Sequence, residues 1–247
     1  MNTFEYLRQS FFFFKQNFTM IAKIQLPFLI VLNGLALSMD INATETDDFR
    51  QQTAYISILS LSFLPIYWGA TILYMQSKLS NSALTASQAI IASLSFWRSL
   101  LFTFILTSFA VFGGLLLLII PGVYIGVRLA FADYICVLEK QTPLNSLKQS
   151  WKESADYFWT LLPGMAILFT GIQLIEMPIA HTLSSMEDRN LILELPIVAI
   201  VDLLGALITV FGFRIYCVMR EENKPKTTGT DDLTDNTDNT DNTDNKE

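Results

Sequence analysis

Charged residues, cysteine and histidine are scarce in this chain of 247 residues. Only 16% of its residues are charged, whereas a soluble domain carries about 25%. Two cysteines and one histidine (Cys136, Cys217 and His181) are too few for a disulfide framework or a His/Cys metal cage. The sequence also lacks a phosphate-binding P-loop, a nucleophile elbow and a zinc-protease motif. It therefore predicts no catalytic residues, no cofactor and no metal, and we expect a protein that is not an enzyme.

Basic residues are also too few to balance the acidic ones, and the formal net charge is −7. The tail holds seven acidic residues, which match that charge in number: Asp231, Asp232, Asp235, Asp238, Asp241, Asp244 and Glu247. Residues 234–245 are four copies of Thr-Asp-Asn, which have almost no apolar surface to bury, so we expect residues 225–247 to be disordered. No basic surface remains for nucleic acid.

Apolar residues are abundant, at 51% of the chain with a mean hydropathy of +0.40. A membrane helix needs about 20 mostly apolar residues, and six segments meet that length. The sequence therefore predicts an all-α polytopic bundle of six transmembrane helices in one membrane domain, residues 1–224. The predicted spans are 20–39, 54–76, 99–120, 121–138, 159–180 and 191–219.

The third and fourth spans form one apolar run interrupted at Pro121-Gly122. A single helix through both would be about 60 Å long, twice the roughly 30 Å hydrocarbon core. Because proline lacks a backbone donor and glycine relaxes the backbone, we interpret the dipeptide as the turn of a helical hairpin.

Lysine and arginine predict that both termini are cytoplasmic, because positive loop residues concentrate on that side. The loops assigned to the other side hold only Arg50 and Arg189. The cytoplasmic segments hold Arg8, Lys15, Lys78, Arg98, Lys140, Lys148, Lys152, Arg220, Lys224 and Lys226.

An amphipathic stretch precedes spans one, three and five. In the first, Phe4, Leu7, Phe11, Phe14 and Phe18 recur at helical spacing, and in the third, Leu144, Leu147, Trp151, Ala155 and Phe158 do so. A weaker version holds Gln88, Ile90 and Trp97. Aromatic, lysine-bearing helices of this kind lie in the headgroup plane. We therefore predict three cytoplasmic interfacial helices, and their recurrence suggests a threefold internal repeat.

Three sequence stretches carry a family resemblance: Ile120-Pro121-Gly122-Val123-Tyr124, Val137-Leu138-Glu139 and Ser146-Leu147-Lys148-Gln149-Ser150-Trp151, with Arg128 and Ala130 between the first two. Together with Phe13-Phe14-Lys15-Gln16-Asn17-Phe18, they resemble the YciC-type integral membrane proteins of Gram-negative bacteria. They are also similar to the membrane domain of some glycerophosphodiester phosphodiesterases. The resemblance implies a bacterial inner-membrane location and no particular activity.

Five charged residues inside the apolar runs form the candidate buried polar network: Arg128, Asp133, Glu176, Asp202 and Arg214. Charges within spans usually face the bundle interior, where they act as structural clamps or line a solute path, and both roles stay open. From depth along straight helices, we expect Asp133 to pair with Arg214. By the same reasoning, Arg128 pairs with Glu176, Asp202 or both.

The sequence favours a non-enzymatic multi-pass inner-membrane protein that serves envelope or membrane homeostasis through contacts with lipids or with unknown membrane proteins. The alternative is a small-solute or lipid transporter that uses the buried charges. Measuring which added solutes raise the melting temperature of the purified protein discriminates between these functions, because a transported ligand stabilises the native state.

Overall fold

The computed structural model describes residues 3–42, 46–185 and 190–223. Every regular element in these ranges is a helix. The helices are α1 (Thr3–Asn42), α2 (Thr46–Leu79), α3 (Ala86–Leu94), α4 (Trp97–Leu117), α5 (Ile119–Arg128), α6 (Ala132–Leu138), α7 (Pro143–Glu153), α8 (Phe158–Ser184), α9 (Leu191–Leu203) and α10 (Ala206–Glu222). The predicted all-α class is confirmed, and the predicted tail lies outside the described residues.

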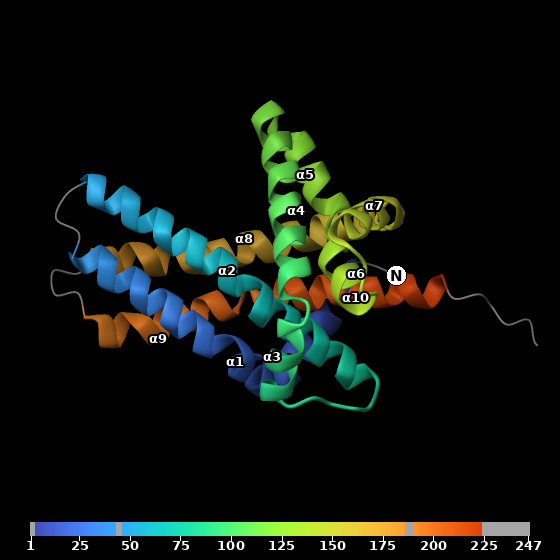
Figure 1. Cartoon of the computed structure of the whole chain (residues 1–247), viewed down its shortest axis with the longest axis horizontal. Helices are drawn as coiled ribbons and strands as arrows, with labels where there is room; N and C mark the ends of the chain where they lie inside the picture. The colour runs from blue at the N-terminus through green and yellow to red at the C-terminus, as the bar shows by residue number, and fades with distance from the viewer. Residues whose placement is uncertain (1–2, 43–45, 186–189, 224–247) are drawn as a thin grey trace, which may run out of the picture.

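Six helical segments are long and apolar enough to cross a membrane, in agreement with the predicted number. They are Thr3–Met39, Thr53–Leu79, Trp97–Leu117, Ile119–Leu138, Phe158–Ser184 and Leu191–Glu222. In Figure 1, the first residues of α1 and the last turn of α10 lie at the same end of the molecule. This arrangement agrees with both termini lying on one side of the membrane.

The long helices fall into two groups with different directions. Figure 1 shows α1, α2, α8 and the α9–α10 pair running along the long axis of the molecule, while the α4–α5 hairpin runs crosswise to them. The far end of this hairpin carries exposed aliphatic side chains, with Ile119 74% and Ile120 81% exposed. The hairpin therefore adds a separate apolar arm to the bundle.

The turn of the hairpin is at Leu118, where the backbone is extended (φ −164°, ψ 158°), and not at Pro121-Gly122. Pro121 instead lies in the first turn of α5, where its missing N–H leaves no helical hydrogen bond unmade. Gly114 and Gly122 allow the two arms to touch, because a Cβ on Gly114 would lie 2.8 Å from the Gly122 Cα. The prediction of a hairpin was right, and its turn was misplaced by three residues.

The interfacial helix predicted before the first span is not a separate element. α1 is one unbroken helix of 40 residues, about 60 Å long. Its buried face near the N-terminus carries Tyr6, Ser10 and Phe14. Phe14 belongs to the predicted apolar stripe, whereas Phe4 and Phe11 of the same stripe are 68% and 59% exposed. The stripe is therefore divided between the packed face and the exposed surface.

α3 and α7 occupy the other two predicted amphipathic stretches as separate helices. α3 begins with a capping box formed by Thr85 and Gln88, which satisfies two backbone donors at the helix start. α7 turns Ser146 and Ser150 inward and leaves Leu144 and Trp151 exposed. An exposed apolar face is what a helix needs in order to lie at the membrane interface. The interfacial placement and the threefold repeat stay predictions.

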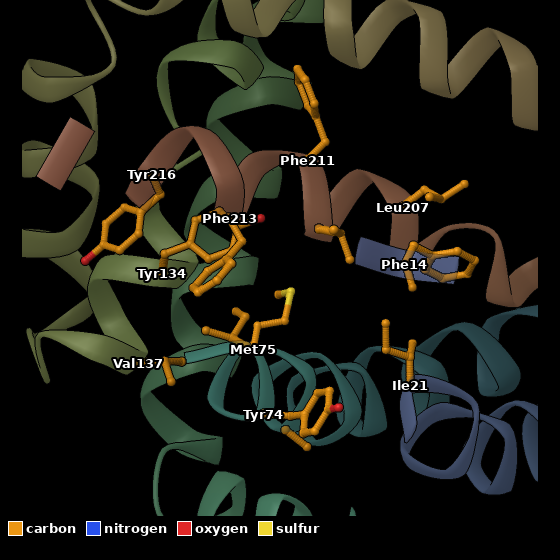
Figure 2. Close-up of a cluster of buried hydrophobic side chains, with 14 of the residues drawn as sticks. Phe14, Ile21, Tyr74, Met75, Tyr134, Val137, Leu207, Phe211, Phe213 and Tyr216 are labelled. Carbon is orange, nitrogen blue, oxygen red and sulfur yellow. The ribbon is translucent and has the colours of Figure 1, made fainter. Parts of the chain in front are cut away.

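α10 forms the centre of the bundle. Most of its side chains are buried, including Phe211 at 0% exposure, and it contacts α1, α2 and α8. Figure 2 shows Phe14 and Ile21 of α1, Tyr74 and Met75 of α2, and Tyr134 and Val137 of α6 gathered around Leu207, Phe211, Phe213 and Tyr216 of α10. The last helix of the chain thus supplies the middle of the hydrophobic core.

Candidate functional site

The five charged residues of the predicted network do not form one network. They lie on α5 (Arg128), α6 (Asp133), α8 (Glu176), α9 (Asp202) and α10 (Arg214). Salt bridges between described residues join Arg220 to Glu139 and to Glu153 and involve none of the five. The predicted ion pairs are therefore wrong, and the partners of these side chains explain why.

Arg128 packs against aromatic rings. Its guanidinium carbon lies 4.9 Å from the Trp151 ring centroid and 5.8 Å from that of Tyr124, an arrangement in which the ring faces attract the cation. Its carbonyl oxygen accepts hydrogen bonds from the Ser150 hydroxyl at 3.0 Å and the Ser154 hydroxyl at 2.7 Å. Arg128 therefore joins α5 to α7 and does not pair with Glu176 or Asp202.

Asp202 pairs with a neutral amide. The Asn33 Nδ2 of α1 donates a hydrogen bond of 2.7 Å to the Asp202 Oδ2 of α9. The sixth span tightens directly after this residue, where α9 ends at Leu203 and α10 begins at Ala206, while Leu204 and Gly205 between them keep helical backbone angles. The Gly205 N–H bonds back to the Asp202 carbonyl at 2.9 Å, as in one turn of a 3₁₀ helix. A carboxylate thus lies beside a locally tightened turn of a continuous span.

Arg214 bonds to α1 and not to Asp133. Its Nε donates a hydrogen bond of 2.9 Å to the Gln9 Oε1. The Asp133 and Glu176 carboxylates make no hydrogen bond or ion pair with any residue that the structure describes. The partner of Arg214 is therefore the neutral Gln9 amide and not a carboxylate.

A polar cluster at the end of α10 was not predicted from the sequence. Arg220 forms a salt bridge with Glu139, at the end of α6, and another with Glu153, at the end of α7, where the distance is 3.1 Å. The Tyr216 hydroxyl donates to Glu139 at 2.8 Å, and the Gln149 amide donates to both glutamates. Two acidic residues beside an amphipathic helix, in a basic segment predicted to be cytoplasmic, were the signal that could have revealed this cluster.

A second contact at this end joins the start of α8 to the end of α10. The Tyr157 hydroxyl, just outside the fifth span, donates a hydrogen bond to Glu222. Burial raises the pKa of Tyr157 above its ordinary value, and the contact with the Glu222 carboxylate raises it further. The phenol therefore stays protonated at neutral pH and holds the Glu222 carboxylate.

A cavity of about 470 Å³ lies between α1 and α10, next to the last residue of α2. Its charged lining residues are both arginines, Arg8 and Arg214. Neutral polar groups and apolar walls complete it: Gln9, Ser10, Gln16, Phe12, Phe13, Leu79, Val210, Phe213 and Cys217. We call this site the α1/α10 cavity. It combines a basic end with a wall of aromatic and aliphatic side chains, a combination that suits an amphipathic anion.

A neighbouring cavity of about 370 Å³ shares Leu79 and Cys217 with it but has a different charge pattern. Its lining includes Arg220 together with Glu221, so a carboxylate accompanies the cation. Groups of three or more His, Cys, Asp or Glu residues able to hold a metal ion are absent from residues 3–42, 46–185 and 190–223.

Comparison with known proteins identifies a family. The model of an uncharacterised protein family, UPF0259, matches residues 57–218. A UPF0259 membrane protein of Pectobacterium carotovorum is 26% identical over 153 residues, which cover 62% of this chain and 60% of the relative. A UPF0259 membrane protein of Buchnera aphidicola is 27% identical over 123 residues, which cover 50% of this chain and 49% of the relative. The chain thus spans about half the length of the Buchnera relative.

No solved structure matches the chain. The matched family region begins within α2 and ends within α10. It therefore includes the α4–α5 hairpin and the α10 wall of the α1/α10 cavity. It also includes Glu139, Glu153 and Tyr216, the partners of Arg220, but not Arg220 itself.

Proposed function

We propose that this chain, which belongs to the UPF0259 family of membrane proteins, is a non-enzymatic inner-membrane protein that acts through contacts with membrane lipid. Its role is in envelope or membrane homeostasis, and both termini face the cytoplasm. The YciC-type resemblance supports the inner-membrane location, and the basic loops support the orientation.

The α1/α10 cavity carries this proposal. It lies level with Leu79, the last residue of the second span, and therefore at an edge of the bundle where headgroups meet hydrocarbon. Its rim is accessible, with Phe12 66% and Leu79 53% exposed. A basic site next to apolar walls at the cytoplasmic edge of membrane helices fits a lipid headgroup followed by its acyl chain.

Lipid retention tests this proposal. The protein, purified in mild detergent from membranes, is examined by native mass spectrometry for bound phospholipid, with detergent-washed samples as the control. We expect phospholipid that persists after delipidating washes and that raises the melting temperature when added back, because a ligand of the native state stabilises it. A protein free of lipid whose melting temperature is indifferent to added phospholipid would refute a function based on lipid contact.

Transport is the second candidate, and the Asn33–Asp202 hydrogen bond supports it. An ionisable residue inside a membrane span is a candidate for a substrate or ion path, and Asp202 lies inside the sixth span beside its 3₁₀ turn, bonded to the Asn33 amide of the first span. In proteoliposomes, a transporter would lose uptake of its solute on Asp202→Asn while keeping its fold. Unchanged uptake in that variant would eliminate this path.

A further inference from the structure

We propose that the α1/α10 cavity binds one anionic phospholipid, with its phosphate between Arg8 and Arg214 and an acyl chain along the wall formed by Phe12, Phe13 and Val210. This inference rests on the proposed function and adds the class of lipid and the residues that select it. It follows from the charge of the cavity, the free donors of Arg214 and the shape of the apolar wall.

The cavity has a positive charge that its own lining does not neutralise. Arg8 and Arg214 are accompanied by the neutral side chains of Gln9, Ser10 and Gln16, and no carboxylate is among the described residues of the lining. Arg8 is exposed and Arg214 is half-buried, so an anion that enters from the rim can reach both cations. A phosphate placed between them would be attracted by both.

Arg214 is held in position by one hydrogen bond, and its remaining N–H donors face no described partner. Its Nε is occupied by the Gln9 Oε1 at 2.9 Å, and neither of its terminal Nη atoms has a hydrogen bond or ion pair with a described residue. With both Nη groups free, the planar guanidinium can donate two parallel N–H bonds to the oxygens of a phosphate. The hydrogen bond to Gln9 also fixes the side chain toward α1, on which Arg8 lies.

The nearby acidic side chains either accept a hydrogen bond from another residue or lie outside the described lining of the cavity. Glu222 accepts a hydrogen bond from Tyr157, Glu221 belongs to the neighbouring cavity that also holds Arg220, and Glu5 is absent from the lining of the α1/α10 cavity. Because none of the described lining residues is a carboxylate that could pair with an ammonium group, a zwitterionic ethanolamine headgroup gains less here than a headgroup with net negative charge.

The wall of the cavity distinguishes a lipid from a free anion. Phe12, Phe13, Leu79, Val210 and Phe213 make most of the lining apolar. Inorganic phosphate would leave this surface uncovered, whereas an acyl chain covers it. The exposed rim at Phe12 and Leu79 gives a lipid a lateral route into the cavity.

The test compares phosphatidylglycerol with phosphatidylethanolamine, added to the full-length protein in detergent and quantified by native mass spectrometry. The variants are Arg8→Gln, Arg214→Gln and their double mutant. Lys15→Gln is the matched control, since Lys15 is an exposed cation on α1 that does not line the cavity. Arg214→Lys keeps the charge, and Leu79→Trp fills the rim without changing any charge.

We expect the wild-type protein and Lys15→Gln to prefer phosphatidylglycerol. Each Arg→Gln change should weaken that binding about fivefold, and the double mutant about 30-fold, as expected for basic groups near an anionic headgroup. Arg214→Lys keeps the charge but loses both the planar guanidinium and the Nε bond to Gln9, so its binding should fall between those of the wild-type protein and Arg214→Gln. Leu79→Trp should lose the binding. Melting curves of each variant identify any that fail to fold, and the Arg8→Gln and Leu79→Trp results then decide the question.

Failure of this inference differs from failure of the proposed function. If the wild-type protein and the double mutant hold both lipids equally, the protein contacts lipid but the α1/α10 cavity does not select an anionic one. If inorganic phosphate displaces phosphatidylglycerol at equal concentration, the cavity is an anion site and not a lipid site. If neither lipid is retained by any variant, the proposed function falls together with the inference.

Discussion

Gly164 of α8 is the position where a single added methyl group should damage the core most clearly. A Cβ built on Gly164 would lie 2.0 Å from the Phe211 Cζ and 2.5 Å from its Cε1. Phe211 is fully buried at 0% exposure, so its ring has no open space into which to move. Gly164→Ala therefore forces the central helix α10 away from α8.

The size of the effect follows from two opposing contributions. Overpacking a buried site costs about 1–3 kcal/mol, and a contact this short belongs at the upper end of that range. Replacing glycine by alanine in a helix returns up to about 1 kcal/mol. The net loss is about 2 kcal/mol, which lowers the melting temperature of a chain of this size by roughly 4–8 °C.

A thiol-reactive fluorescent dye provides the measurement in a Cys217→Ser background, because the remaining thiol, that of Cys136, is buried in the core and reacts only when the bundle opens. Gly171→Ala is the matched control. Gly171 lies seven residues further along the same helix, and a Cβ there would meet nothing within 4 Å. We expect the control to melt at or slightly above the wild-type temperature.

A compensating change provides a second check. Phe211→Leu alone leaves a cavity, and in the double mutant the methyl group added by Gly164→Ala fills part of it, so the combined loss should be smaller than the sum. Equal melting temperatures for Gly164→Ala and Gly171→Ala would refute the packing of Phe211 on α8.

Three further predictions concern the α4–α5 hairpin, the Arg220 cluster and the topology. Gly122→Val should lower the melting temperature, because its Cβ would lie 2.5 Å from the Leu115 side chain, whereas Gly113→Val meets nothing within 4 Å and should be tolerated; equal losses would contradict the contact between the arms. Arg220→Gln should destabilise the protein by about 1–3 kcal/mol by leaving Glu139 without its cation, and measurably less when Glu139→Gln is also present; additive losses would exclude the coupling. A reporter fused after residue 226 should read cytoplasmic, and a periplasmic signal would reverse the orientation.

The spans could be predicted because membrane insertion imposes a simple requirement of length and apolarity. Each predicted span overlaps a helical segment able to cross a membrane. The boundary predicted between an interfacial helix and the first span does not exist in the structure, where α1 is continuous. The change from polar to apolar residues near Phe18 determines whether headgroups or hydrocarbon surround the helix, but it does not interrupt the backbone. The first proline within α1 is Pro27, well past this change. Nothing in the chain ends the helix there.

The ion pairs could not be predicted because depth along a helix says nothing about direction around it. The calculation also assumed straight spans, whereas the fourth span turns between Arg128 and Ala132 and the sixth tightens between Leu203 and Ala206. Only charged residues were considered as partners, yet Asn33 and Gln9 are the groups that bond to Asp202 and Arg214. A neutral amide can be the hydrogen-bond partner of a charged side chain, and a search for pairs of opposite charge in the sequence does not find it.

The central position of α10 has a consequence for how the protein is made. Synthesis proceeds from the N-terminus, so α1 to α8 leave the ribosome before Phe211 and its neighbours exist. During that interval the face of α1 that carries Phe14 and Ile21, and the face of α2 that carries Met75, lack their packing partner. The helices that precede α10 can already pack on one another, as α1 does on α2. The hydrophobic core is completed only when α10 is in place, so a chain truncated before α10 should be markedly less stable than the full-length protein.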